Sequence, residues 1–337
     1  MRKIFLSYFL LLPIAIKAQS TDFNHINLKK ADSIAMSYKD ASLENLPKLS
    51  YQLTSNLKTD IEKFRAIYKW VCTNIENDYY MYSKNRWRRI KYKDQPKELK
   101  KWNQAFNKEL FKKLRKEKKT VCTGYAYLIK ELSTLAGIEC VIVDGYGKTS
   151  SFDVEKMKRP NHSWNAVRLS GKWYLCDPTW SSGVTNEDTN VFTFKFKEEY
   201  FLPDPKLFVK NHYPLNTKWT LLKNSEITFQ EFLDAPIIYS DAFKHLSEQE
   251  FPKKMHNTVQ KNEVVVFRHK LLDGKNAKNI RLMIDDGDTN KMVKPTMVEH
   301  KKNTFTFEYT FPEKGFYDVH VLIADDVVMT YTFDVKS

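Results

Sequence analysis

The stretch that decides the fold is residues 162–177, which read HSWNAVRLSGKWYLCD. Two runs rich in aromatic and aliphatic residues flank Ser170-Gly171, a dipeptide typical of a tight turn between antiparallel strands. The pattern predicts a β-hairpin with one strand over residues 162–169 and the other over residues 172–177. Such a hairpin fixes which side chains share a face, because successive side chains of a strand point to opposite faces.

The predicted register brings two chemically active side chains together. If Leu169 pairs with Lys172, then His162 and Asp177 lie on one face as diagonal neighbours, and Cys176 points to the opposite face. Diagonal neighbours are about 7–8 Å apart, within reach of a hydrogen bond from an imidazole to a carboxylate. The prediction requires a two- or four-residue turn, since a three-residue loop would reverse the parity.

A cysteine begins the predicted helix that precedes the hairpin. Apolar residues recur at three- and four-residue spacing from Tyr125 to Leu135, and Gly137 is a natural stop, so residues 121–136 are predicted to be helical. Cys122 lies at the start of this helix. The free N–H groups and the partial positive charge of a helix N-terminus favour a thiolate and could hold an oxyanion.

These three residue types form a known catalytic combination. Cysteine acyl-transfer enzymes use a thiol nucleophile, a histidine base and a residue that orients the histidine. In this interpretation His162 takes the proton of Cys122 and later protonates the leaving amine, while Asp177 fixes the tautomer of His162. The alternative is structural: a cysteine at a helix start most often packs, and a histidine at a strand start most often lies in a loop or on the surface.

Ordered motifs then point to a family. They run in sequence over residues 58–235: RAIYKWV (65–71), TVCTGYA (120–126), LAGI (135–138), GY (145–146), HSWNAV (162–167), KWYLCDPTW (172–180), YFLPDP (200–205), HYP (212–214) and KWTLL (218–222). The residues and order of these motifs resemble those of the transglutaminase-like superfamily, and within it those of the kyphoscoliosis peptidase branch and its bacterial relatives.

The resemblance implies a fold and an activity. The implied fold class is α+β, with a papain-like core in which a cysteine-bearing helix packs on an antiparallel sheet. The implied triad is Cys122, His162 and Asp177. The implied activity is acyl transfer on peptide or protein amides, with hydrolysis by a peptidase favoured over cross-linking by a transglutaminase. A binding or scaffold protein that keeps the fold without turnover is the alternative from another class.

Four further residues are candidates for the wall of the site or for an oxyanion donor. Trp164 and Trp180 follow His162 and Asp177 closely in sequence, and Trp87 lies upstream of Cys122 as a possible oxyanion donor. Asn77 stands where the branch commonly has a tyrosine. This substitution favours keeping the scaffold alternative open.

The cysteine pattern favours neither a metal nor a cofactor. None of the four cysteines is in a C-x-x-C pair, so a zinc site is not expected. The turn at Asp286-Gly287 lacks the spacing of a calcium loop. Cys72 is expected to pack in the core. A disulfide between Cys140 and Cys176 is less expected than two buried thiols, because neighbouring strands are bridged poorly in many registers.

The positive charge of the chain is concentrated in one segment. The chain has 55 Lys and Arg against 41 Asp and Glu, a net charge of +14, but residues 84–119 alone hold 16 against four. Apolar residues at helical spacing predict a basic pair of amphipathic helices there. The ordinary interpretation is a solvated helix face. The functional alternative is a docking surface for an acidic protein or polymer beside the cleft.

The amino terminus has the pattern of an export signal. Residues 1–18 combine a basic start with an apolar run over 4–16, which is shorter than the roughly 20 residues that span a bilayer. We therefore expect an exported protein, periplasmic or secreted, with no membrane span. Export in turn argues against a nucleic-acid partner.

The remaining organisation follows from local patterns. Residues 19–57 are predicted to be an N-terminal helical segment, and residues 58–235 the transglutaminase-like domain, with residues 84–119 as a basic insertion. Residues 236–337 are predicted to be a linker and an immunoglobulin-like β-sandwich, because short apolar runs alternate with turn signals there.

Overall fold

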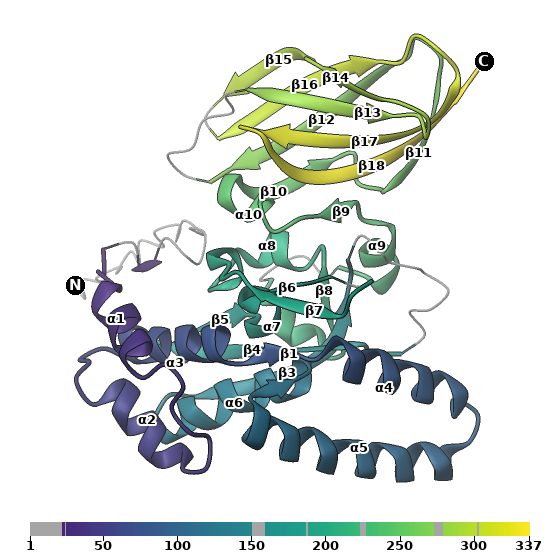
Figure 1. Ribbon diagram of the computed structural model, residues 1–337. Helices are drawn as coiled ribbons and strands as arrows, with labels where there is room; N and C mark the ends of the chain where they lie inside the picture. The colour runs from purple at the N-terminus through teal and green to yellow at the C-terminus, as the bar shows by residue number, and fades with distance from the viewer. Residues whose placement is uncertain are drawn as a thin grey trace, which may run out of the picture.

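The computed structural model divides into a helical and mixed lower half and an upper half of strands (Figure 1). It describes residues 22–23, 25–149, 159–186, 188–222, 227–272, 279–301 and 303–337. The predicted export signal lies outside these residues. Within the described ranges, no helix combines the length and the apolar character needed to cross a membrane.

Four helices form one side of the core. They are α1 (Lys29–Ser37), α2 (Leu46–Thr54), α3 (Asp60–Asn74) and α6 (Cys122–Leu135). The longest of these four, α3, begins with a capping box in which Thr59 and Glu62 satisfy each other's backbone N–H groups. Phe64, Ile67 and Trp70 of α3 are fully buried in the core that these helices share. The helical segment before residue 58 therefore packs as part of this core.

A four-stranded antiparallel sheet forms the other side of the core. Its order is β5 (Lys172–Cys176), β4 (His162–Leu169), β3 (Cys140–Gly147) and β8 (His212–Pro214). Leu169 pairs with Lys172, which is the register that the hairpin pattern predicted. One face of the sheet packs on the core of the four helices, and the opposite face packs in a second core.

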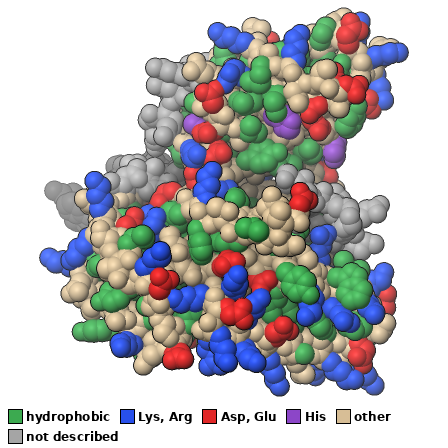
Figure 2. Space-filling model, viewed as in Figure 1, with side chains coloured by type: hydrophobic (Ala, Val, Ile, Leu, Met, Phe, Trp, Pro, Cys, Tyr) green, Lys and Arg blue, Asp and Glu red, His purple; other side chains and the backbone are tan. Residues whose placement is uncertain are grey.

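The basic segment forms a helical arm at one side of the molecule (Figure 1). Its elements are α4 (Tyr79–Lys91) and α5 (Pro96–Glu117), flanked by β1 (Glu76–Asn77) and β2 (Lys119–Thr120), which pair in parallel. Phe106, Leu110 and Leu114 of α5 are buried, which confirms a helix pair with one docked face. Figure 2 shows Lys and Arg side chains along the lower edge of the molecule, where α5 runs.

Short elements joined by loops make up residues 178–245. They are α7 (Pro178–Ser182), β6 (Gly183–Asn186), β7 (Val191–Phe194), η3 (Glu198–Tyr200), α8 (Pro205–Phe208), η4 (Thr217–Thr220), α9 (Phe229–Asp234), β9 (Ile237–Ile238) and α10 (Ala242–His245). None exceeds six residues, which is too short for a helical period to repeat in the sequence.

Two packed sheets form the C-terminal part, which confirms the predicted β region. One sheet has the order β10 (Leu246–Phe251), β12 (Val264–Leu271), β16 (Thr304–Thr310) and β15 (Thr296–Lys301). The other has β11 (His256–Gln260), β18 (Asp326–Lys336), β17 (Gly315–Ile323), β13 (Ile280–Asp285) and β14 (Asn290–Val293), and β9 also pairs with β18. In the described residues of these two sheets, β11 and β18 pair in parallel, and the other strand pairs are antiparallel.

The second core joins the two halves of the molecule. Trp164 and Ala166 of β4 belong to it, together with Phe208 of α8 and the interior of the sandwich. Residues between the halves are therefore packed on both sides rather than free. The domain boundaries drawn from the sequence stay predictions, because this shared core crosses the proposed junction at residue 236.

A buried histidine makes the sandwich sensitive to acid. His269 is fully buried beside Phe305 and Phe307, and burial lowers its pKa to about 3. Below pH 6.5 this histidine binds a proton in the unfolded chain but not in the folded chain. The free energy of unfolding therefore falls as the pH falls. From pH 8 to pH 5 this effect amounts to about 2 kcal/mol, and we expect His269→Leu to remove it.

Urea unfolding at pH 8 and pH 5 measures this effect. The matched control is His256→Leu, which changes an exposed histidine of β11. An equal loss of stability at acid pH in wild type and in His269→Leu would contradict the prediction.

Candidate active site

Local geometry places Cys122 at the first residue of α6. The preceding Val121 is extended and provides no side-chain cap, so the first N–H groups of α6 lack a side-chain acceptor from the cap position. A Cβ at Gly124 would lie 1.9 Å from Oγ1 of Thr120, so only glycine lets α6 begin this close to β2. Cys122 itself is half-buried, whereas the other three cysteines are buried.

His162 and Asp177 are joined directly. His162 is the first residue of β4, and its Nε2 lies 2.7 Å from Oδ2 of Asp177. The predicted end of the second strand was one residue too long, since β5 ends at Cys176 and Asp177 caps α7. Its Oδ1 accepts hydrogen bonds from the backbone N–H groups of Thr179 and Trp180, at 2.8 and 3.2 Å. The cap thus turns Oδ2 toward His162.

The second ring nitrogen of His162 is left for the thiol. The His162 side chain also interacts with the thiol of Cys122. Because Nε2 is occupied by Asp177, Nδ1 is the ring nitrogen available to the sulfur. Burial by itself lowers the pKa of His162, but the charge and hydrogen bond of Asp177, with the contact to Cys122, raise it to about 10. Burial raises the pKa of Asp177, but His162 and His212 outweigh it and hold that pKa well below its usual range.

A second histidine, which the sequence did not assign, contacts the same carboxylate. Nε2 of His212 lies 3.0 Å from Oδ2 of Asp177, and Nδ1 lies 2.7 Å from the side-chain amide of Asn211. The ring stacks on Phe208 with the centroids 3.8 Å apart. The HYP motif at 212–214 was the one signal in the sequence, but a three-residue strand has too few positions to reveal its pairing.

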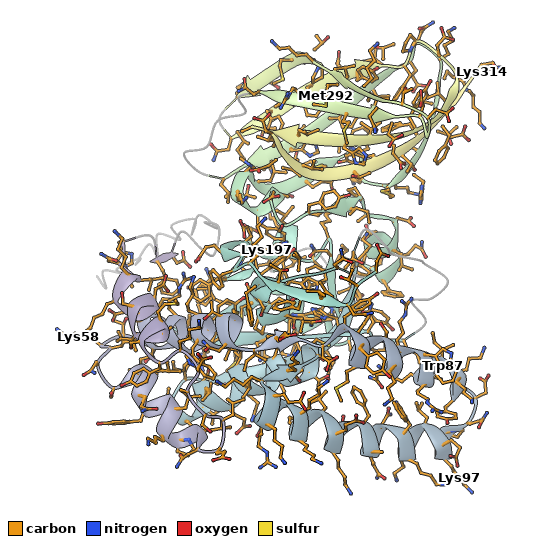
Figure 3. All side chains as sticks on the ribbon, viewed as in Figure 1. Lys58, Trp87, Lys97, Lys197, Met292 and Lys314 are labelled. Carbon is orange, nitrogen blue, oxygen red and sulfur yellow. The ribbon has the colours of Figure 1, made fainter. Side chains whose placement is uncertain are left out.

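The other four predicted site residues lie in different places in the structure. Trp180 lines the cleft, with its ring 5.3 Å from that of His162, and Asn77 lines the cleft as well. Trp164 is 1% exposed and packs behind His162. Trp87 is 56% exposed on the outside of α4 and is not among the residues that line the cleft (Figure 3). An indole there has no contact with Cys122, so the structure gives its oxyanion role no support.

The cleft itself has a volume of about 550 Å³. Cys122 and His162 lie in its lining, together with residues of α4, α7, β6 and β7, and residues 237–240 close it on the side of the sandwich. Its charged lining groups are Arg86, Lys148 and Lys197, and none of the described lining residues is acidic. Figure 3 shows Lys197 between the core and the sandwich.

Lys148 holds the sandwich side of the cleft in place. Its side chain is buried, and its ammonium group donates to the carbonyl oxygens of Phe232 and Ala235, both at 2.7 Å. Burial, followed by the charge of Lys210, lowers the pKa of Lys148 to about 7. The carbonyls belong to the end of α9 and the residue after it, directly before the segment that lines the cleft.

Buried hydroxyl groups support the backbone behind Asp177. The hydroxyl oxygen of Tyr68 lies 2.9 and 3.0 Å from the carbonyl oxygens of Asp177 and Tyr200, which compete for its single proton, and 2.6 Å from Oγ of Ser181. The hydroxyl of Ser181 also donates to the carbonyl oxygen of Lys197, so it ties α7 to the residue before η3.

The three ligand-type side chains around Asp177 are close enough to be considered as a metal site. His162, Asp177 and His212 each offer an atom within 4.8 Å of the others. However, both rings lie at direct hydrogen-bond distance from one oxygen, Oδ2, at 2.7 and 3.0 Å. This arrangement fits hydrogen bonding to a shared carboxylate.

The other cysteines are free thiols. Cys72, Cys140 and Cys176 are buried, and no disulfide joins any of the four described cysteines. Burial raises the pKa of all three, that of Cys140 to about 12. The open question of a bond between Cys140 and Cys176 is thereby answered in favour of two buried thiols.

Comparisons with known proteins show what this chain is similar to. Residues 47–178 match the family model described as the transglutaminase-like superfamily. The chain is 30% identical to the kyphoscoliosis peptidase of Homo sapiens over 301 residues, 86% of this chain and 42% of that protein. It is 30% identical to the Mus musculus protein of that name over 77% of this chain and 38% of that protein. Hillarin of Drosophila melanogaster is 28% identical over 65% of this chain and 26% of that protein.

Solved structures match more weakly. A crystal structure of a TGase matches with a TM-score of 0.28 and 17% identity, and covers 54% of this chain and 40% of that chain. The Lin-41 filamin domain matches with a TM-score of 0.20 and 15% identity, and covers 23% of this chain and 82% of that chain. At TM-scores this low, neither match bears on the fold or function of this chain.

The fold, the cysteine-bearing helix and the matched segment define a transglutaminase-like protein. Residues 47–178 belong to the transglutaminase-like superfamily. Over most of its length the chain is similar to the kyphoscoliosis peptidases. The chain spans about two fifths of the length of these curated relatives.

Proposed function

We propose that this protein is a cysteine-dependent acyl-transfer enzyme that hydrolyses peptide or protein amides. The observation that carries the proposal is the chain of contacts from Cys122 through His162 to Asp177, with 2.7 Å between His162 Nε2 and Asp177 Oδ2. A buried imidazole held between a thiol and a carboxylate is the arrangement that acyl transfer needs. The kyphoscoliosis peptidases among the relatives support hydrolysis.

The chemistry follows from the roles of the three side chains. The sulfur of Cys122 attacks the carbonyl carbon, and the C–N bond breaks after His162 gives its proton to the leaving amine. N–H groups at the start of α6 stabilise the oxyanion. Water, deprotonated by His162, then attacks the thioester and releases the acid, which restores the thiol. An amine in place of water would give transamidation instead.

Export is part of the same proposal. We propose that residues 1–18 direct the protein to the periplasm or the medium, where its substrates would be exported proteins. The supporting observation is the sequence pattern of a basic start and a short apolar run.

Mass spectrometry of reaction products tests the activity. The protein is incubated with a mixture of exported proteins, and Cys122→Ala is treated in parallel. New peptide termini that depend on Cys122 are expected. A mass gain with loss of ammonia would assign transamidation instead, and identical products from both proteins would favour a scaffold of the same fold.

We propose further that the arm guides acidic segments of the substrate toward the cleft. Residues 84–119 carry most of the net charge of the chain, and Arg86 of α4 reaches the cleft. Exposed charges of one sign attract an oppositely charged partner over about 10 Å at 0.1 M salt.

Charge reversal at the arm measures this guidance. We expect Arg86→Glu to lower kcat/KM for an acidic peptide about tenfold at low salt, and to leave a neutral peptide of equal length unaffected. The matched control is Lys58→Glu, which makes the same kind of change at an exposed lysine outside the arm (Figure 3). The peptides for this assay are taken from the cleavage sites that the product mass spectrometry identifies. A loss that is the same for both peptides would contradict guidance by charge.

A further inference from the structure

The carboxylate of Asp177 has one more partner than a triad requires. Its Oδ1 accepts two backbone N–H groups of α7, and its Oδ2 faces Nε2 of both His162 and His212. An ionised carboxylate has about four acceptor sites, and here all four are occupied. Asp177 is fully buried, so these four groups replace the water that would otherwise stabilise its charge.

His212 is suited to donate to this carboxylate. An ionised carboxylate only accepts hydrogen bonds, so Nε2 of His212 carries a proton. Burial, more than the nearby charge of His162, lowers the pKa of His212 to about 4, so the ring is neutral at pH 7. It therefore supplies a hydrogen bond without adding a second positive charge that would compete with the imidazolium of His162.

The position of the His212 ring is fixed from several sides. Phe208 stacks on it at 3.8 Å, the ring of Trp180 lies 4.3 Å away, and the side-chain amide of Asn211 lies 2.7 Å from Nδ1. A neutral ring that carries its proton on Nε2 accepts a hydrogen bond at Nδ1, so this role requires the amide NH2 group of Asn211 to face Nδ1. The strand that carries it, β8, pairs with β3 through His212 and Gly147. A Cβ at Gly147 would lie 3.1 Å from Cβ and Cγ of His162, so the same position of β3 packs against both histidines.

We propose that His212 is a positioning residue of the site, which holds the Asp177 carboxylate ionised and directed at His162. The proposal rests on the proposed function, because it assigns His212 a place in the same catalytic group. His212 does not touch the reacting atoms. Its effect reaches Cys122 through Asp177 and His162.

Two variants separate this role from simple packing. His212→Phe keeps a flat ring against Phe208 and removes the donor, whereas His212→Gln keeps an N–H group near the position of Nε2. The readout is the rate of Cys122 alkylation by iodoacetamide between pH 5 and pH 9, followed by mass spectrometry. This readout needs no substrate.

The expected result is a change in the pH profile. In His212→Phe the alkylation rate at pH 5–6 falls at least tenfold, because Asp177 loses a donor and supports the charge of His162 less well. At pH 9 the rate stays within about threefold of wild type. In His212→Gln the rates stay within about threefold over the whole range. Equal behaviour of the two variants, or an unchanged profile in His212→Phe, would overturn the proposal.

A measurement on the wild-type protein covers the case in which His212→Phe does not fold. NMR of protein labelled with ¹⁵N-histidine reports which ring nitrogens carry protons. A neutral His212 protonated at Nε2 between pH 6 and pH 8 is expected, and an unprotonated Nε2 would overturn the proposal. Failure of the proposed function looks different, since alkylation can follow the expected profiles while the product assay shows no Cys122-dependent cleavage.

Discussion

Iodoacetamide at pH 6 will alkylate Cys122 about 10- to 100-fold faster than an ordinary free thiol, and His162→Ala will remove this advantage. The raised pKa of His162, about 10, means that an imidazolium faces the sulfur at this pH and stabilises the thiolate. An ordinary thiol is almost entirely protonated at pH 6 and reacts slowly. The advantage is less than the thiolate fraction alone suggests, because stabilised thiolates are weaker nucleophiles.

Controls for this experiment lie within the chain. The three buried cysteines, Cys72, Cys140 and Cys176, are internal references that should stay unlabelled while the protein is folded. The matched variant is His245→Ala, because His245 forms a similar pair with Asp326 in the other half of the molecule, at 2.9 Å.

This variant should leave the labelling of Cys122 unchanged. Labelling of wild type with the pH profile of a free thiol would contradict the proposal that Cys122 is the nucleophile. Equal rates in wild type and His162→Ala would contradict it as well.

Asp177→Ala is expected to cause the largest combined loss of activity and stability. Hydrolysis should fall by about 10³- to 10⁴-fold, because His162 loses the group that sets its tautomer and stabilises its charge. The free energy of unfolding should fall by about 3–5 kcal/mol, since two buried histidines and the N-terminus of α7 lose their common acceptor. Urea unfolding at pH 7 and kcat on a cleaved peptide are the measurements.

The stability that Asp177 contributes depends on pH in a definite direction. The folded pKa of Asp177 is lowered, so its contribution to stability is present above the unfolded pKa of about 3.9 and is lost as the pH falls below it. The difference in stability between wild type and Asp177→Ala should therefore shrink toward acid.

The matched control for stability is Asp326→Ala, which removes the partner of His245. The side chain of Asp326 is 34% exposed, so its loss should cost less than about 1 kcal/mol. An equal effect of the two substitutions would contradict a special role for the carboxylate of Asp177.

Local patterns in the sequence predicted most of the fold. The alternation of residues 162–177 and the short turn after Leu169 predicted the register that β4 and β5 have, because a strand pattern and its turn are set by neighbouring residues. The helical period of residues 121–136 and of the basic segment was equally visible, and α5 and α6 follow it.

Local patterns failed where pairing is decided far along the chain. The strand β11 is parallel to β18, and its partner lies some 75 residues away, so no turn fixes their pairing. The segment that closes the cleft, residues 237–240, has no periodicity of its own. It pairs with β18, and Lys148 bonds the residues just before it.

The sequence by itself determined that a cysteine begins a helix and that His162 and Asp177 share one face of a hairpin, because both facts follow from periods of a few residues. Only the tertiary structure decided that Asp177 caps α7, that Trp180 faces the cleft while Trp164 is buried, and that His212 meets the same carboxylate. His212 lies 35 residues beyond Asp177 on a three-residue strand. A contact of that kind is made by packing, and packing leaves no period in the sequence.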